Sequence, residues 1–226
     1  MKKLVVFTGA GISAESGIAT FRASDGLWAN YRIEDVCTPE ALLNNREQVI
    51  DFYNMRRKEV LTKQPNAAHL GLKDLEKNFD VQIITQNVDD LHERAGSKNV
   101  LHLHGEIRKL CSSRDVSQTV ELEGWEQNLD ARHSDGSLLR PFIVFFGEQV
   151  PLLSQAIDIT AEANTFVVIG TSLQVYPAAS LLHYVRPDAQ IYLIDPNVPA
   201  TSLRDSVHII QKSATEGIKD LINALL

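Results

Sequence analysis

Two histidines close together are the side chains in this sequence best suited to acid–base chemistry. His102 and His104 lie two residues apart in the run 100–105, which reads VLHLHG. An imidazole titrates near neutral pH and can accept or donate a proton during a reaction. The pair could instead bind a metal, but the nearby sequence offers no third ligand with convincing spacing. We therefore predict one catalytic histidine beside one structural histidine.

A cluster of amides and carboxylates follows the β-rich run 81–85. Gln86, Asn87 and Asp89 come directly after this run and before a helix-like segment. In an open α/β sheet, ligands bind where polar side chains gather at the carboxyl ends of strands. Asn and Asp are also the commonest helix caps, so capping is the alternative explanation for these residues.

A glycine turn follows the first apolar run, 4–7. Gly9 and Gly11 allow a buried strand to turn tightly and to present backbone N–H groups to a phosphate. The usual dinucleotide fingerprint needs a third glycine soon after Ser13, whereas the next glycine is Gly17. No carboxylate closes a second strand about twenty residues on, so the turn predicts nucleotide binding but not a dehydrogenase. The same loop carries rings and a cation that could cover a ligand: Phe21, Arg22 and Trp28.

Tyr53 and Arg56 form a second candidate pair. They lie three residues apart in the amphipathic stretch 48–61 and therefore share one face of the predicted helix. By periodicity alone they are a solvated tyrosine and arginine. The adjacent Arg57 lies about 100° further round the helix and is expected to face elsewhere. An aromatic-rich extended stretch, 142–148, is either a buried strand or a strand whose free edge holds an extended peptide.

The composition is that of an ordinary globular protein. Of 226 residues, 44% are hydrophobic and 23% are charged, which predicts neither disorder nor a membrane protein. The net charge of −7 gives no basic footprint for nucleic acid. The first apolar run is too short for the core of a signal peptide, and Cys37 and Cys111 are far apart. We expect reduced thiols, a cytoplasmic location, and no nucleic-acid or membrane partner.

The order of apolar runs predicts the fold class. Between 111 and 140, Ser, Asp, Glu, Gln and Gly dominate and apolar periodicity disappears, which predicts an inserted, loop-rich module. Elsewhere β-rich runs alternate with helical patterns, so we predict an α/β fold with a doubly wound, mostly parallel six-stranded sheet. The six candidate strands are 4–7, 81–85, 100–105 with both histidines on one face, 165–169, 191–194 and 207–210.

Five motifs, in this order and at these intervals, resemble the sirtuins, the NAD-dependent protein-lysine deacylases. They are GAGIS with SGIATFR, TQNVDDLHERAG, HLHGE, FFGE and GTSLQVYPAA, and they span nearly the whole chain. The resemblance implies a single catalytic domain, 1–226, with a Rossmann-like large part and two insertions that form a small part. The large part would cover about 1–30, 66–108 and 145–226, with a helical insertion at about 31–65 and a degenerate zinc-ribbon segment at about 109–142.

The resemblance also implies a site that consumes NAD. His104, Asn87 and Asp89 would be catalytic, and His104 would take a proton from a ribose hydroxyl. The products would be free lysine, nicotinamide and O-acyl-ADP-ribose. Asp195 departs from the asparagine often found after that strand, which leaves its contact undefined. The residues implied to bind NAD are Gly9, Ala10, Gly11, Ile12, Ser13, Gly17, Thr20, Phe21, Arg22, Trp28, Gln86, Asn87, Val88, Asp89, His104, Gly170, Thr171, Ser172, Asp195 and Ala214.

Acyl-lysine proteins or peptides are the implied substrates of a monomeric enzyme. In the sirtuins that prefer acidic acyl groups, a Tyr-x-x-Arg reaches the end of the acyl pocket, and Tyr53 and Arg56 match it. A guanidinium can bind a carboxylate in bidentate fashion and the phenol adds a donor, so we expect removal of succinyl or malonyl groups and weaker deacetylation. The other residues implied to contact substrate are Val144, Phe145, Phe146, Gly147 and Val175.

One departure from the family pattern concerns zinc. The usual ribbon has two Cys-x-x-Cys pairs, but here Cys111 stands alone and no second pair occurs before Arg140. A tetrahedral structural site needs four ligands, and His133 with Asp135 is a poor substitute for three thiolates. We therefore expect a shortened module that holds no zinc.

Two other functions use the same kind of pocket. One is a sirtuin-type protein ADP-ribosyltransferase, and the other is a non-catalytic module that senses NAD. The presence of His104, Asn87 and Asp89 argues against the silent module.

Overall fold

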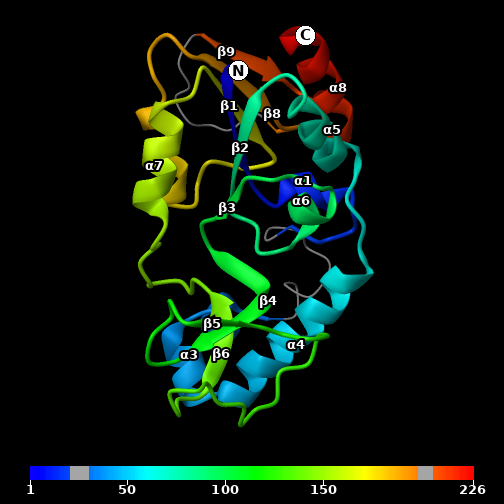
Figure 1. Ribbon diagram of the computed structural model, residues 1–226. Helices are drawn as coiled ribbons and strands as arrows, with labels where there is room; N and C mark the ends of the chain where they lie inside the picture. The colour runs from blue at the N-terminus through cyan, green and yellow to red at the C-terminus, as the bar shows by residue number, and fades with distance from the viewer. Residues whose placement is uncertain (21–30, 198–205) are drawn as a thin grey trace.

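A six-stranded sheet forms the centre of the larger part of the molecule (Figure 1). The computed structural model describes residues 1–20, 31–197 and 206–226. The strand order is β3-β2-β1-β7-β8-β9 and each neighbouring pair is parallel, which confirms the predicted doubly wound sheet. The strands are β1 (Lys3–Thr8), β2 (Asp80–Thr85), β3 (Val100–His102), β7 (Thr165–Ile169), β8 (Gln190–Ile194) and β9 (Val207–Ile210).

The strand order reverses between β1 and β7. From β1 the sheet extends to β2 and β3 on one side, and from β7 it extends to β8 and β9 on the other. In an open α/β sheet, the loops beyond the carboxyl ends of the strands at such a point form the ligand crevice. Gly9 and Gly170, which directly follow β1 and β7, therefore lie at this switch point.

Helices cover both faces of the sheet (Figure 1). Leu4 and Val6 of β1 belong to a core shared with α5 and α8, whereas Val5 and Phe7 belong to a core shared with α7 and η2. Because alternate residues of β1 enter different cores, all four residues between Lys3 and Thr8 are apolar. None of the helices in the described ranges combines the length and apolarity needed to span a bilayer. The helices are α1 (Gly11–Ala14), α5 (Ala67–Leu75), α6 (Leu91–Arg94), α7 (Leu153–Ala161), the 3₁₀ helix η2 (Ala178–Tyr184) and α8 (Ala214–Leu225).

A three-stranded antiparallel sheet and, among the described residues, the helices α2, α3 and α4 form the smaller part (Figure 1). The segment 111–140, predicted to be loop-rich, thus contains strands that extend the sheet from β4. Its pattern hid them because β5 is only three residues long and exposes Thr119 and Glu121. The elements are α2 (Ile33–Val36), α3 (Pro39–Asn44), α4 (Arg46–Thr62), β4 (Gly105–Ser112), β5 (Thr119–Glu121) and β6 (Leu139–Ile143), with strand order β5-β4-β6.

The junction between the two sheets lies just after His102. The strand predicted to continue toward Gly105 ends at His102, and His104 lies in the turn that follows. Gly105 has a φ of 86°, and a Cβ there would lie 2.1 Å from Phe142 O, so a glycine is required where β4 begins. His102 and His104 therefore do not share one strand, contrary to the prediction.

Candidate active site

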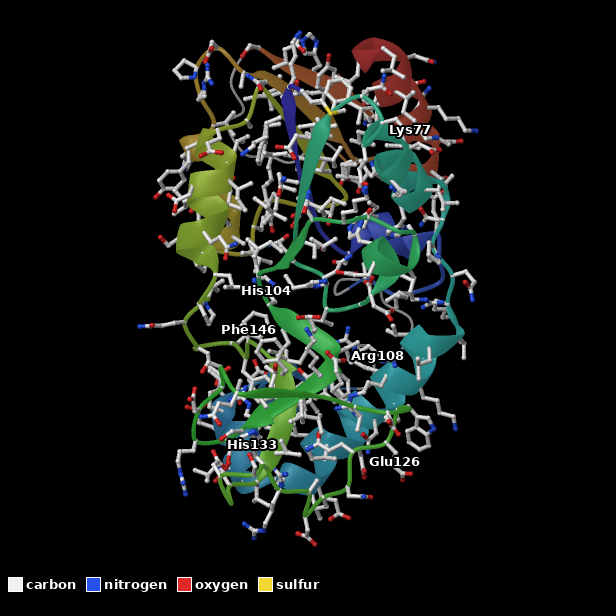
Figure 2. All side chains as sticks on the ribbon, viewed as in Figure 1. Lys77, His104, Arg108, Glu126, His133 and Phe146 are labelled. Carbon is white, nitrogen blue, oxygen red and sulfur yellow. The ribbon has the colours of Figure 1, made fainter. Side chains whose placement is uncertain are left out.

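A cavity of about 250 Å³ lies where the two parts meet. Its wall comes from the loops after β1, β2 and β3, from α4 and from the segment after β6. Figure 2 shows two of the lining residues, His104 and Phe146, close to each other between the large and the small sheet. The predicted site residues that line the cavity are Ala10, Ser13, Tyr53, Arg56, Gln86, Asn87, Val88, Asp89, His104, Val144, Phe145, Phe146, Gly147 and Val175.

The glycine turn after β1 packs backbone to backbone against the loop after β7. Gly9 N donates a hydrogen bond to Ile169 O at 3.0 Å, and Gly11 N donates to Gly170 O at 2.8 Å. A Cβ added at Gly11 would lie 2.6 Å from Gly170 Cα, so only glycine allows this approach. The two loops expected to hold phosphate groups therefore form one packed unit.

Gln86 has a buried amide nitrogen without a hydrogen-bond partner in the described part of the protein. Its Oε1 accepts from Thr171 Oγ1 at 2.9 Å, whereas Nε2 has no acceptor. A buried N–H that lacks a partner is costly, and Gln86 lines the cavity. This nitrogen is therefore suited to donate to a ligand, which fits the nicotinamide and ribose pocket implied for NAD.

Asn87, Ser13 and Asp89 form a chain of hydrogen bonds on the cavity wall. Asn87 Nδ2 donates to Ser13 Oγ at 3.1 Å, and this hydroxyl donates to Asp89 Oδ2 at 3.1 Å. Burial raises the pKa of the Asp89 carboxyl, against the smaller opposing effects of its hydrogen bonds from Leu91 N and Ser13. The chain joins the loop after β1 to the loop after β2, so these predicted residues are held together.

The imidazole of His104 is set up to accept a proton. Its Nδ1 lies 3.1 Å from Gln86 O, which can only accept, so Nδ1 carries the hydrogen and Nε2 keeps its lone pair. Burial lowers the pKa of His104, against the smaller opposing effect of the bond to Gln86. The ring is therefore neutral at pH 7 and lines the cavity as a potential base.

His102 has a different environment. Its Nδ1 lies 2.8 Å from Asn87 O and its Nε2 lies 2.8 Å from Glu93 Oε1, so both nitrogens face acceptors. Burial alone would lower the pKa of His102, but the hydrogen bond and the charge of Glu93 outweigh it and raise the pKa. His102 is absent from the cavity lining and supports the backbone of Asn87, which matches the structural role predicted for one histidine of the pair.

Tyr53 and Arg56 reach the cavity from α4. Tyr53 is fully buried, and its hydroxyl lies 3.2 Å from the Sγ atom of Cys37. Burial raises the pKa of both the phenol and the thiol, so neither group ionises near neutral pH. Both cysteines are free and buried, and Cys37 lines the same cavity as Tyr53 and Arg56.

Arg57, the neighbour of Arg56, points away from the cavity. Its guanidinium is fully buried and donates to Ile107 O at 2.8 Å, to Asn54 Oδ1 at 2.5 Å and to Trp125 O at 2.9 Å. These contacts join α4 to β4 and to the segment before β6. The angular separation predicted for the two arginines is therefore confirmed.

The segment after β6 is attached by its backbone to the turn at His104 and to Cys37. Val144 N donates to His104 O at 2.9 Å, and Phe146 N donates to Cys37 O at 3.0 Å. The ring of Phe145 stacks on Tyr53 with centroids 5.9 Å apart. Gly147 and Phe146 continue the wall toward solvent, where Phe146 is exposed. This segment thus forms one side of the cavity along its length.

Several predicted cofactor residues lie outside this cavity. Ile12 is fully buried in the core shared with α5 and α8, and Ala214 belongs to the same core. Asp195 directly follows β8, and burial raises the pKa of its carboxyl. Also absent from the lining are Gly9, Gly11, Gly17, Thr20, Gly170, Thr171 and Ser172, while Phe21, Arg22 and Trp28 lie outside the described residues.

The cavity contains residues that sequence reasoning did not identify. Glu148 follows the turn at Gly147 within the FFGE motif, so the motif itself held the signal. Cys37 lies beside the start of α3, and no sequence pattern reveals its contact with Tyr53. The others are Ile18, Ala19, Val60, Ile143, Val150, Tyr176 and Pro177.

A hydrogen-bonded cluster lies at the end of β4, near Cys111. Ser112 Oγ donates to Asp135 Oδ2 at 2.6 Å and accepts from the backbone N–H of Arg114 at 3.0 Å. Cys111 Sγ faces Pro141 O at 3.8 Å. Among the residues that the structure describes, no group of three or more His, Cys, Asp or Glu side chains is arranged to hold a metal.

Comparisons with known proteins agree with this geometry. A protein of Bacteroides thetaiotaomicron named NAD-dependent protein deacylase is 52% identical over 231 residues, which cover 100% of this chain and 99% of that protein. A solved Sir2 homologue in complex with NAD is similar with a TM-score of 0.89 and 39% identity, covering 99% of this chain and 89% of the other. A solved Sir2 complex with a p53 peptide and NAD gives a TM-score of 0.81 and 32% identity, covering 98% and 92%. Since a model of the Sir2 family also matches residues 9–177, the chain belongs to the Sir2 family, the sirtuins.

Proposed function

We propose that this sirtuin is an NAD-dependent protein-lysine deacylase that prefers succinyl and malonyl groups and removes acetyl groups more slowly. The observation that carries the proposal is the presence of a neutral His104 and the cation Arg56 in the wall of one cavity. The relative from Bacteroides thetaiotaomicron, named as a deacylase, and the Sir2 complex with a peptide and NAD support the reaction class.

The described residues fit NAD at the switch point of the sheet. NAD, when bound, supplies an ADP-ribosyl group that accepts the acyl group as nicotinamide leaves. The packed turns at Gly9 and Gly170 would hold its phosphates, and the unpartnered amide nitrogen of Gln86 would donate to it. His104 would accept a proton at Nε2, since Gln86 O fixes the hydrogen on Nδ1. Asn87 and Asp89 would be held for their roles by Ser13.

The acyl preference follows from the chemistry of the α4 side chains. The guanidinium of Arg56 can pair with the carboxylate of a succinyl or malonyl tail. Tyr53, whose phenol can donate a hydrogen bond, lines the same cavity. An acetyl group offers this cation no partner. Phe145, stacked on Tyr53, would enclose the apolar part of the acyl chain.

The experiment that tests this proposal compares two substrates on the Arg56→Met variant. One peptide is prepared with a succinyl-lysine or an acetyl-lysine, and kcat/KM is measured for both with saturating NAD. We expect the variant to lose about tenfold to a hundredfold on the succinyl peptide, as when a charged hydrogen bond is removed, and little on the acetyl peptide. Equal losses on the two peptides would refute the acidic-acyl preference.

We also propose that the smaller part holds no structural zinc. Ser112 supports this, because its hydroxyl binds Asp135 and two backbone N–H groups, those of Arg114 and Asp115. In a zinc ribbon, a thiolate bound to metal would organise such a turn. The hydroxyl cluster would organise it here without metal.

A further inference from the structure

Arg140 and Glu148 form an ion pair beside the cavity. Arg140, in β6, is only 6% exposed, and its Nη1 and Nη2 atoms lie 2.6 Å and 2.9 Å from Oε1 and Oε2 of Glu148. The Nη2 atom also donates to Ile143 O at 2.9 Å, and Phe145 N donates to Glu148 Oε2 at 2.7 Å. The bidentate pair therefore closes the turn that contains the predicted substrate segment.

The two partners occupy different positions relative to the cavity. Glu148 lines the cavity, whereas Arg140 is absent from the lining and lies behind the wall. The guanidinium carbon of Arg140 is 4.3 Å from the ring centroid of Phe145, and Tyr53 also stacks on this ring. Arg140 thus supports the wall of the acyl pocket from outside while it neutralises a carboxylate that faces inside.

Glu148 and Arg56 both line the cavity, and both act on the thiol of Cys37. Burial is the main cause that raises the pKa of the Cys37 thiol, and of the nearby charges Arg56 lowers this pKa while Glu148 raises it. Among the described residues, the Arg, Lys, Asp and Glu side chains that line the cavity are Arg56, Asp89 and Glu148. An acidic acyl tail would add a carboxylate to this set, so the charge of Glu148 has to be balanced.

We propose that Arg140 is a positioning residue for acyl selection. Because Arg140 pairs with Glu148 and balances its negative charge, Arg56 determines the sign of the charge that the acyl tail meets. The inference rests on the acidic-acyl preference proposed above. Without Arg140, the carboxylate of Glu148 would repel a succinyl tail but not a neutral acetyl group. Phe145 would also lose the cation packed on its outer face.

The test measures kcat/KM of the wild type and four variants on the succinyl and acetyl forms of one peptide. In Arg140→Met, we expect the succinyl-to-acetyl ratio to fall about tenfold, because a carboxylate in the wall loses its partner. In the double variant Arg140→Met with Glu148→Gln, the ratio should return to within about threefold of the wild-type value, since the repelling charge is gone. Glu148→Gln alone should keep or raise the ratio. Arg132→Met, which removes an exposed arginine of the same part, should leave it unchanged.

A purely structural role for Arg140 predicts a different pattern. Both substrates would then lose activity in parallel and Glu148→Gln would not restore the ratio, which would overturn the inference. If Arg140→Met does not fold, Glu148→Gln alone decides, and a lower ratio in that variant contradicts the inference. The proposed acyl preference itself would be overturned if the wild-type succinyl-to-acetyl ratio is below one and Arg56→Met leaves that ratio unchanged. A ratio that falls in Arg56→Met but not in Arg140→Met overturns only the role of Arg140.

Discussion

Replacing Arg57 by methionine should destabilise the fold strongly. The side chain is fully buried, and its guanidinium donates to two backbone carbonyls, those of Ile107 and Trp125, and to the Asn54 side chain. Burial lowers the pKa of Arg57 to about 10, so the group stays charged at pH 7. The acceptors of these hydrogen bonds are neutral carbonyl and amide oxygens. The network therefore depends on one cation that joins α4 to β4 and the segment before β6.

The size of the loss follows from the acceptors that would be stranded. Methionine can fill much of the volume of Arg57 but donates no hydrogen bond to Ile107 O or Trp125 O. Each buried acceptor left without a donor costs about 1–3 kcal/mol, so we expect a loss of about 3–5 kcal/mol in the free energy of unfolding. For a chain of this size, that loss lowers Tm by roughly 10 °C or more.

Urea unfolding followed by circular dichroism would measure this loss. Lys58→Met is the matched control, because Lys58 is the next residue on α4 and is exposed. This substitution also removes one positive charge. Its contact with the Trp125 ring at 5.0 Å is worth about 0.5–1 kcal/mol. A loss below about 1 kcal/mol in Arg57→Met, equal to that of Lys58→Met, would refute the view that this network holds α4 to β4 and to the segment before β6.

Two further predictions concern protonation and metal content. Because burial lowers the pKa of His104 and a base must be neutral to act, the acid limb of kcat/KM for the acyl peptide should have its midpoint below the ordinary imidazole value of about 6.5. A midpoint above that value would contradict the assigned environment. Elemental analysis of the purified protein should find much less than one zinc per chain, and treatment with a chelator should leave Tm unchanged, because Ser112 and Asp135 organise the turn by hydrogen bonds. One tightly bound zinc per chain would refute the zinc-free module.

The large sheet could be predicted from the sequence because its strands are buried on both faces. Val5 and Val6 enter different cores, so β1 reads as an unbroken apolar run, and the same holds for β7. The smaller sheet gave no comparable signal. β5 covers three residues, and its Val120 is the one side chain of the three that is not exposed. A pattern needs more positions than this before a period of two can be recognised.

The candidate site was predictable where it depends on local geometry. The spacing of Tyr53, Arg56 and Arg57 on one helix determines which of them share a face, and the structure has the arginines as expected. Contacts between distant segments were not accessible in this way. Two examples are the hydrogen bond between Cys37 and Tyr53 and the position of Arg140 behind Phe145. Both depend on how separate elements pack.

The turn at Gly105 has a consequence for how this protein can vary. His104 precedes β4 directly, Val144 follows β6 directly, and the backbone bond between them closes the base of the hairpin-like excursion that runs through the smaller sheet. The segment 105–143 therefore begins and ends at one backbone hydrogen bond, from Val144 N to His104 O. Length, sequence and even the means of stabilisation can therefore change at the far end, around Ser112, while the spacing of His104, the proposed base, and Val144, in the proposed substrate wall, is kept. The segment around Ser112 departs most from the sequence of a zinc ribbon. Changes in that segment should have the least effect on the geometry at His104.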